Sequence, residues 1–322
     1  MPKVSVVIVT YNHEEYISQA IECVLKQDTR YSYEIVVGED CSSDNTRQIV
    51  LGMQALFPSK IRVIMSDTNV GVAENLNRTI LSCDSEYIML IPGDDYLHAQ
   101  KAIDKLIAFM DSNLEYGLAF AEYNILYEDG RLEKSHIKHS DINIPEPIKF
   151  EDMIIKNYVD GIPICIRRDL LITYYDHQIV KKKGFISEDY PTWIELSRHT
   201  SIYFYRSEPL ATYRVLSTSI SHQKDKQYQL EYFKSNYNVK FYYIEKYGVS
   251  KRIVNMIYKG YYLGLLKHAM NMHDSYAGKN AYRNLIDYRL TKKEKTVARL
   301  MCWSSNNYFN YFVIKIVLKY FR

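Results

Sequence analysis

The sequence of 322 residues contains no apolar run long enough to cross a membrane as a helix. The early apolar segment Val4–Val9 is too short for a signal peptide and is followed by no small-residue cleavage site. The five cysteines are odd in number and show no Cys-x-x-Cys spacing, which argues against a disulfide framework or a zinc site. These absences predict a protein of a reducing, cytoplasmic compartment.

Two common phosphate-binding motifs are missing as well. Neither Gly-x-Gly-x-x-Gly nor Gly-x-x-x-x-Gly-Lys-Ser/Thr occurs in the chain. The first is typical of dinucleotide-binding domains and the second of P-loop proteins. A nucleotide bound by this chain must therefore have its phosphates held in another way.

Charge is distributed unevenly along the chain. Residues 1–222 carry 22 Lys and Arg against 32 Asp and Glu, a net charge of −10. Residues 223–322 carry 19 against 6, a net charge of +13. We therefore expect two domains with these boundaries, the second a basic, Tyr-rich helical region with an anionic partner.

Short apolar segments alternate with amphipathic segments in the first domain. Strands are expected at residues 4–10, 33–40, 61–66 and 87–91, with helices between them and after residue 95. This alternation predicts a mostly parallel α/β sheet with helices on both faces, which binds ligands at the carboxyl ends of its strands. Further along, hairpins are expected at residues 117–134 and 201–215.

Every expected strand ends in polar or acidic residues. The ends are Thr10-Tyr11-Asn12, Glu39-Asp40, Asp67-Thr68-Asn69 and Gly93-Asp94-Asp95. For the last end alone, a turn with Asp95 as a helix cap is a sufficient explanation. A turn does not explain why all four ends are polar. A divalent cation does, because it takes oxygen ligands and can join carboxylates to a nucleotide diphosphate.

Six segments in order carry a resemblance to a known family. They read VSVVIVTYN, EIVVGEDCSSDNT, DTNVGVAENLN, YIMLIPGDDYL, SEDYPTWIELS and EPLATYRVLSTSISH. With them the chain resembles family-2 glycosyltransferases of the GT-A fold, which is Rossmann-like. The resemblance implies an inverting hexosyltransferase that uses a nucleotide sugar, most often a UDP-sugar, and Mn²⁺ or Mg²⁺. The implied acceptor is a saccharide or lipid-linked saccharide, in the biosynthesis of cell-envelope polysaccharide.

The resemblance places the donor at the first strand ends. Thr10, Tyr11, Asn12, Glu39 and Asp40 match positions around uracil and ribose. Each has a structural alternative, since a strand end or a turn accounts for these residue types.

Four further positions complete the implied donor site. Asn69 and Gly71 match an Asn-x-Gly turn, although a positive-φ turn alone explains the glycine. Gly93 lies at the fourth strand end, and Arg214 matches a residue that could contact the diphosphate.

The implied metal site departs from the family pattern. Asp94 matches the second acidic position and is the predicted ligand, but Pro92 stands at the first. Leu216 stands where a histidine is common, so His222 is a candidate replacement, with a solvated or structural histidine as the alternative.

The implied catalytic base is Asp189, with Glu188 beside it as the second candidate. A base is needed because the attacking hydroxyl must lose its proton. Asp189 could also be a helix cap, since Pro191 suits a first turn. The Trp193 ring could lie against the acceptor sugar, or it could simply pack in the core.

Residues 223–322 lie outside the resemblance. Basic residues beside Tyr and Phe favour an anionic membrane surface, at the inner face of the cytoplasmic membrane. Intramolecular packing and a homo-oligomer contact are alternatives, and no nucleic-acid-binding signature is present.

Two rival functions stay open for the first domain. One is a non-catalytic nucleotide-sugar binder, and the other is a sugar nucleotidyltransferase, which TYNHEEY (10–16) disfavours because it contains no glycine-rich loop.

Overall fold

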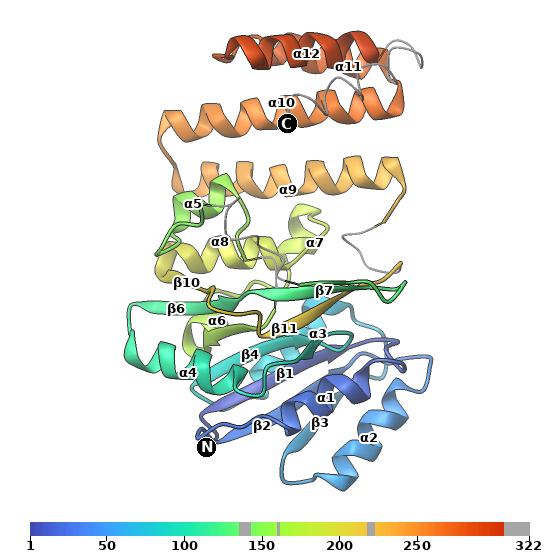
Figure 1. The fold of residues 1–322 in the computed structure, drawn as a ribbon, viewed down its shortest axis with the longest axis vertical. Coiled ribbons are helices and arrows are strands. Elements are labelled where there is room, and N and C mark those ends of the chain that lie inside the picture. The colour runs from blue at the N-terminus through green and yellow to red at the C-terminus, as the bar shows by residue number, and fades with distance from the viewer. Residues whose placement is uncertain (135–142, 160–161, 218–222, 306–322) are drawn as a thin grey trace. The chain divides into compact units, whose positions relative to one another are not determined.

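The computed structural model describes residues 1–134, 143–159, 162–217 and 223–305. Its contacts divide the chain into two compact units, Met1–Ser219 and Ile220–Arg322 (Figure 1). Over the described residues, the first unit is α/β and the second is helical.

The described part of the first unit contains a seven-stranded sheet with the order β10-β6-β9-β4-β1-β2-β3. β9 runs antiparallel to its neighbours β4 and β6, and the other pairs are parallel. The predicted mostly parallel α/β sheet is thus confirmed. The strands are β1 Val4–Thr10, β2 Tyr33–Glu39, β3 Ile61–Met65, β4 Tyr87–Pro92, β6 Tyr116–Ala121, β9 Ile164–Arg167 and β10 Ser201–Tyr205.

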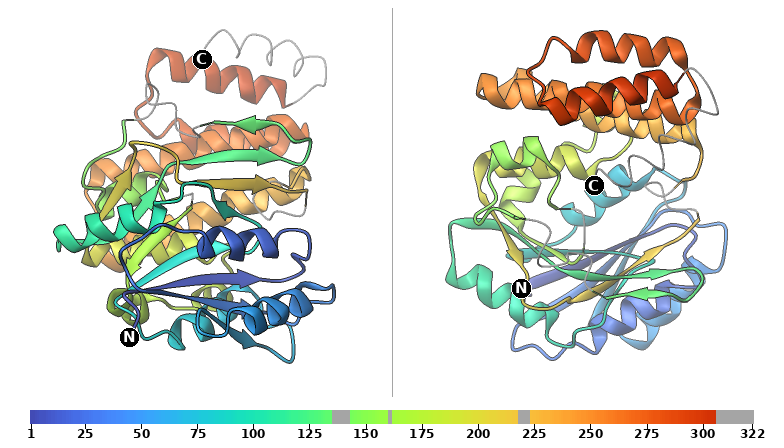
Figure 2. Two further views of the ribbon diagram at one scale, coloured as in Figure 1. Left: turned by 60° about the horizontal axis from the view of Figure 1, so that its bottom comes forward. Right: turned by 45° about the horizontal axis from the view of Figure 1, so that its top comes forward.

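Helices cover both faces of this sheet (Figure 2). Alternate residues of β1 point to opposite faces, and Val4, Val6 and Ile8 join one core cluster with the inner stripes of α1 and α4. All three side chains are fully buried, and each burial stabilises the fold by about 1.5–3 kcal/mol. The helices of this unit are α1 Ile17–Leu25, α2 Thr46–Leu56, α3 Val72–Leu81, α4 Ala102–Ser112, α5 Phe150–Ile155, α6 Arg168–Tyr174, α7 Ile179–Lys183 and α8 Asp189–His199.

A smaller sheet has the order β5-β11-β7-β8. Its strands are β5 Tyr96–Leu97, β7 Tyr123–Tyr127, β8 Leu132–Glu133 and β11 Ala211–Val215. Of the hairpin predicted over residues 117–134, β7 and β8 form the part that turns at Asp129-Gly130, whereas residues 117–121 belong to β6 of the large sheet. The predicted hairpin over residues 201–215 is wrong, because β10 joins the large sheet while β11 pairs with β5 and β7. A strand pattern shows which residues are half-buried but not which strand lies beside them.

Residues 223–305 of the second unit form four helices. They are α9 Lys226–Tyr247, α10 Lys251–Met272, α11 Ser275–Leu285 and α12 Lys292–Ser304. Their N-caps are Asp225, Ser250, Asp274 and Thr291, whose side chains all accept a backbone N–H of the first turn. Among the described helices of the chain, none is long and apolar enough to span a membrane.

Candidate active site

The strand register brings three strand ends to one edge of the large sheet. Thr10 of β1 lies opposite Glu39 of β2, and Val9 of β1 lies opposite Pro92 of β4. The last residues of these strands and the residues that follow them are therefore neighbours, and together they include most of the predicted donor-binding positions.

The residues after β1 differ in their surroundings. Thr10 is buried, and its Oγ1 lies 3.2 Å from Nδ1 of His13. Tyr11 is 42% exposed, so its ring is accessible to a ligand. Asn12 has a φ of 56°, and its Oδ1 accepts a hydrogen bond from the Ser43 N–H at 2.8 Å. Asn12 thereby fixes the loop that follows β2.

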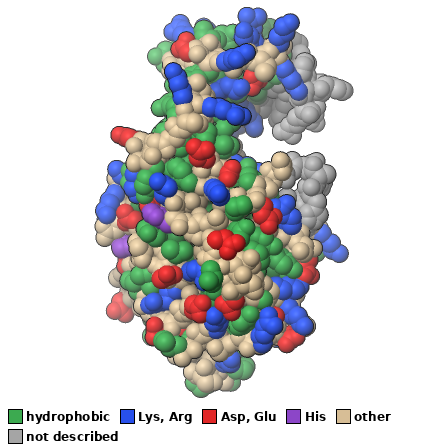
Figure 3. Space-filling view, turned by 90° about the vertical axis from the view of Figure 1, so that its left-hand side faces the viewer, with side chains coloured by type: hydrophobic (Ala, Val, Ile, Leu, Met, Phe, Trp, Pro, Cys, Tyr) green, Lys and Arg blue, Asp and Glu red, His purple; other side chains and the backbone are tan. Residues whose placement is uncertain are grey.

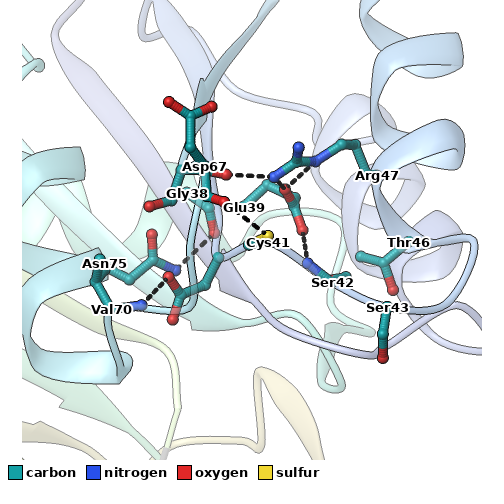
Figure 4. A network of polar contacts seen from close by, with 12 residues as sticks. Gly38, Glu39, Cys41, Ser42, Ser43, Thr46, Arg47, Asp67, Val70 and Asn75 are labelled. Atoms are coloured by element: carbon teal, nitrogen blue, oxygen red, sulfur yellow. Dashed lines mark hydrogen bonds and ion pairs between the residues drawn. The ribbon is translucent and has the colours of Figure 1, made fainter.

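Glu39 is fully buried and held by protein groups on both carboxylate oxygens (Figure 4). One oxygen accepts from the Ser42 N–H at 2.6 Å, and the other from Arg47 Nε at 2.6 Å. Burial alone would raise the pKa of Glu39, but the bonds from Ser42 and Arg47 lower it below its ordinary value. This geometry favours the structural alternative for Glu39, with its carboxylate fixing the loop after β2.

Arg47→Met should therefore destabilise the fold by about 3 kcal/mol, because it leaves the Glu39 carboxylate buried without its cation. Denaturant unfolding at pH 7 measures this. Since the pKa of Glu39 is depressed, the loss should shrink as the pH falls below the ordinary value of 4.5. Arg62→Met is the matched control, because Arg62 pairs with Glu34 near the surface and should lose less than about 1 kcal/mol. Equal losses in the two variants would contradict this account of Glu39.

Asp40 holds the predicted Asn-x-Gly turn. Its Oδ1 accepts the Val70 N–H and its Oδ2 the Gly71 N–H, both at 2.9 Å. The Gly71 N–H also donates to Oδ1 of Asn69 at 3.1 Å. Gly71 has a φ of 87°, which an L side chain rarely adopts, so a glycine is required there. Asp40 thus presents an ordered loop at the strand-end edge.

The turn after β4 contains the predicted metal ligand. A Cβ on Gly93 would lie 2.8 Å from Cβ of Thr10, so glycine allows β1 and β4 to end close together. Among the described residues, no hydrogen bond or ion pair engages the Asp94 carboxylate. This carboxylate can supply one of the several oxygen ligands that a divalent cation takes. No group of three or more His, Cys, Asp or Glu that could hold a metal occurs in the described ranges.

Asp95 is not the helix cap expected from the sequence. The next helix, α4, begins at Ala102 and has Lys101 as its N-cap. Asp95 is instead fully buried, and its Oδ1 accepts the Arg214 N–H at 2.7 Å. Burial, and then the charge of Asp94, raise the pKa of Asp95 well above its ordinary value. Asp95 therefore joins the turn to β11.

Arg214 is turned toward protein groups. It is 8% exposed, and its guanidinium donates to the Asp94 carbonyl and to Oε1 of Gln19. Gln19 could not be singled out from the sequence, because one side-chain amide on a helix is an unremarkable residue. His222, the other metal candidate, lies outside the described residues.

Glu188 and Asp189 lie at the start of α8. Burial, and then the adjacent Asp189 carboxylate, raise the pKa of Glu188 to about 7. Burial also raises the pKa of Asp189, although bonds from Ser187 Oγ and from the Tyr190 N–H oppose the rise. Asp189 is the first residue of the helix and Glu188 its N-cap. A carboxylate pair with raised pKa values suits proton transfer near neutral pH.

Two neighbouring aromatic residues have different roles. Trp193 is 4% exposed and offers almost no ring face to a sugar, which favours the core-packing alternative. Tyr175, which sequence reasoning missed, donates from its hydroxyl to the Ala73 carbonyl at 2.9 Å. The charge of Glu188 is one of the causes that raise the pKa of Tyr175, after burial. Tyr175 therefore bonds to the first turn of α3, which follows Gly71.

Residues 5–172, more than half of the chain, match the family description Glycosyl transferase family 2. The chain belongs to this family. The six sequence segments predicted this membership.

Several curated relatives are similar to this glycosyltransferase. An uncharacterized protein of Mycobacterium tuberculosis is 27% identical over 164 residues, which are 51% of this chain and 46% of that protein. The chain thus spans about half the length of these mycobacterial relatives. The putative teichuronic acid biosynthesis glycosyltransferase TuaG of Bacillus subtilis is 26% identical over 233 residues, which are 72% of this chain and 86% of TuaG.

Solved structures share the fold. TarS residues 1–349 of Staphylococcus aureus in complex with UDP-GlcNAc align with a TM-score of 0.62 at 14% identity, over 99% of this chain and 92% of that one. The mannosyltransferase PcManGT of Pyrobaculum calidifontis, in complex with GDP-Man and Mn²⁺, aligns with a TM-score of 0.59 at 13% identity, over 97% of this chain and 86% of that one. These alignments confirm the GT-A fold.

Proposed function

We propose that this glycosyltransferase moves a sugar from a UDP-sugar to a saccharide or lipid-linked saccharide, with inversion at the anomeric carbon. The observation that carries the proposal is the Asp94 carboxylate, which is engaged by no described residue at the edge where β1, β2 and β4 end. The Asp40-held loop and the accessible Tyr11 ring lie at the ends of the same group of strands.

The relatives support the substrate class. The TarS structure has UDP-GlcNAc bound, and TuaG is named for teichuronic acid biosynthesis. By analogy, the acceptor of this enzyme is a growing cell-envelope polysaccharide. The nucleotide is assigned to the Tyr11 and Asp40 side of the edge and the diphosphate to the Asp94 side.

In the proposed reaction, the acceptor hydroxyl attacks the anomeric carbon while the bond from that carbon to the diphosphate breaks. The hydroxyl proton passes to Asp189, and the bonding electron pair leaves with UDP. Asp94 would hold Mn²⁺ or Mg²⁺ together with oxygens of the donor. The cation, when bound, would offset the charge that develops on the leaving diphosphate.

A non-catalytic nucleotide-sugar binder is the second candidate. It is favoured by Pro92 at the first acidic position and by the single carboxylate of the metal site in the described residues. Catalysis distinguishes the two candidates, whereas binding alone does not.

A nucleotide panel tests the donor assignment. Thermal unfolding of the full chain is followed with UDP, GDP, ADP and CMP, each with Mn²⁺ and with EDTA. A ligand that binds the folded state raises the midpoint. The proposal expects the largest rise with UDP in Mn²⁺. An equal rise with all four nucleotides, or none with UDP, would contradict it.

We also propose that the second unit attaches the enzyme to an anionic membrane surface, where a lipid-linked acceptor would be met. Figure 3 shows Lys and Arg side chains gathered over this unit. On α12, Lys292, Lys293, Lys295 and Arg299 are exposed, and Trp303 is 54% exposed near its end. Basic residues and an indole ring suit the headgroup region, where each cation contributes about 1 kcal/mol.

Replacing Lys292, Lys293 and Lys295 together by Glu should lower partitioning onto anionic vesicles more than tenfold, since each charge is reversed. Co-sedimentation with phosphatidylglycerol vesicles measures this, and phosphatidylcholine vesicles show the charge-independent part. The matched control reverses three exposed lysines of α7, residues 181–183. Equal partitioning of the two triple variants would reject the membrane role of α12.

A further inference from the structure

Arg214 is attached to the Asp94 turn at two points. β11 and β5 pair with Thr212 opposite Tyr96, so the same antiparallel register brings Arg214 level with Asp94. The Arg214 N–H donates to Oδ1 of Asp95 at 2.7 Å, and the guanidinium donates to the carbonyl oxygen of Asp94. The backbone of Asp94 is thus held at its own carbonyl and at the next residue.

The guanidinium is itself held on several sides. Its central carbon lies 4.9 Å from the ring centroid of Tyr16 and 4.8 Å from that of Tyr96. Gln19 of α1 accepts a further hydrogen bond from it. Stacking between two rings while donating in the guanidinium plane requires a flat, multiply donating cation, which lysine cannot supply.

The carboxylate of Asp94 has no such support from the part of the chain that the structure describes. No described residue forms a hydrogen bond or an ion pair with it. Its direction therefore depends on the backbone of the turn, and that backbone depends on Arg214. A ligand without a supporting side-chain partner loses affinity when its backbone is free to move.

We propose that Arg214 is a positioning residue for Asp94, and that it acts through the turn rather than by contact with the donor diphosphate. The inference rests on the proposed function, because it concerns the cation that Asp94 would hold. It replaces the expectation from the sequence that Arg214 contacts diphosphate. The buried position of Arg214 and the direction of its donors toward Asp94 and Gln19 support the replacement.

The test separates the two roles by comparing UDP affinity with and without the cation. Calorimetry gives the dissociation constant of UDP in Mn²⁺ and in EDTA for the wild type and for Arg214→Lys. If Arg214 positions Asp94, the gain in affinity that Mn²⁺ provides should fall about tenfold or more in the variant. The affinity in EDTA should stay the same. Arg131→Lys is the matched control, because Arg131 also stacks on a tyrosine, Tyr127, but lies on the β7–β8 hairpin.

Two results would overturn the inference. One is an unchanged gain from Mn²⁺ in Arg214→Lys. The other is an equal loss of affinity in Mn²⁺ and in EDTA, which would mean that Arg214 binds the donor directly. If Arg214→Lys does not fold, Gln19→Leu removes one support of the guanidinium and should lower the gain in the same direction. A wild type without any gain from Mn²⁺ would instead reject the metal assignment in the proposed function, and this inference with it.

Discussion

Asp189→Asn is expected to lower the turnover number by about a hundredfold or more, which is the usual effect of removing a general base. The dissociation constant of the donor should not change, because the proposed donor groups are at the ends of β1, β2 and β4. The amide keeps the shape of the side chain and can still accept the bonds from Ser187 and from the Tyr190 N–H. Single-turnover rates and donor calorimetry on the same preparation measure the two quantities.

Glu188→Gln is the control for this prediction. Its turnover at pH 8 should stay within about tenfold of the wild type if Asp189 is the base. A variant Asp189→Asn that keeps wild-type turnover would reduce Asp189 to a residue at the start of α8. If Glu188→Gln then loses turnover instead, Glu188 becomes the base.

The pH dependence of kcat/KM adds a second readout. Asp189 works as a base only when it is ionised, so the wild-type value should fall at acid pH as Asp189 takes up a proton. Burial raises the pKa of Asp189, so this fall should come at a higher pH than for an exposed aspartate. After burial, the charge of Asp189 helps to raise the pKa of Glu188, so Glu188 is protonated first as the pH drops, and Glu188→Gln should leave the fall in place. A fall that disappears in Glu188→Gln would mean that Glu188 is the base.

Asp94→Asn should lower the gain in UDP affinity that Mn²⁺ provides by about tenfold or more, because no group of metal-binding side chains in the described residues could replace the Asp94 carboxylate. Asp95→Asn is the matched control at the adjacent position. An asparagine Oδ1 accepts the Arg214 N–H as the Asp95 carboxylate does, so the turn keeps its attachment to β11. Calorimetry in Mn²⁺ and in EDTA measures both variants.

The outcome of this pair decides which aspartate is the ligand. If Mn²⁺ still raises the UDP affinity of Asp94→Asn but no longer raises that of Asp95→Asn, the cation is assigned to Asp95. Equal loss in both variants, with normal thermal stability, would mean that the two carboxylates share the cation.

The fold of the first unit was predictable because its signals are local. Buried β-branched strands and amphipathic helices alternate at short spacing, and this order leaves few topologies to a parallel sheet. The partner of β11 was not predictable, since it pairs with β7 and β5, which are distant in sequence. Half-buried alternation in residues 201–215 fits a hairpin as well as two strands of different sheets.

The candidate site could be predicted from the sequence as a set of strand ends, but the role of each residue could not. Glu39 and Asp40 are adjacent acids in the sequence, yet one is held by Arg47 and the other holds the Gly71 turn. Asp94 and Asp95 divide in the same way, one without a described partner and the other buried against β11. These roles depend on which groups each side chain contacts in the fold. Those contacts cannot be inferred from the spacing of residues in the sequence.

Release of UDP from a panel of UDP-sugars, with and without Mn²⁺, tests directly whether the protein is a metal-dependent, inverting sugar transferase. The full chain is incubated with each donor and with a polysaccharide acceptor fraction, and UDP and the anomeric configuration of the product are determined. We expect that at least one UDP-sugar is consumed in Mn²⁺, that EDTA abolishes this, and that the transferred sugar has the inverted configuration. A product with retained configuration, or equal rates in Mn²⁺ and EDTA, would contradict it.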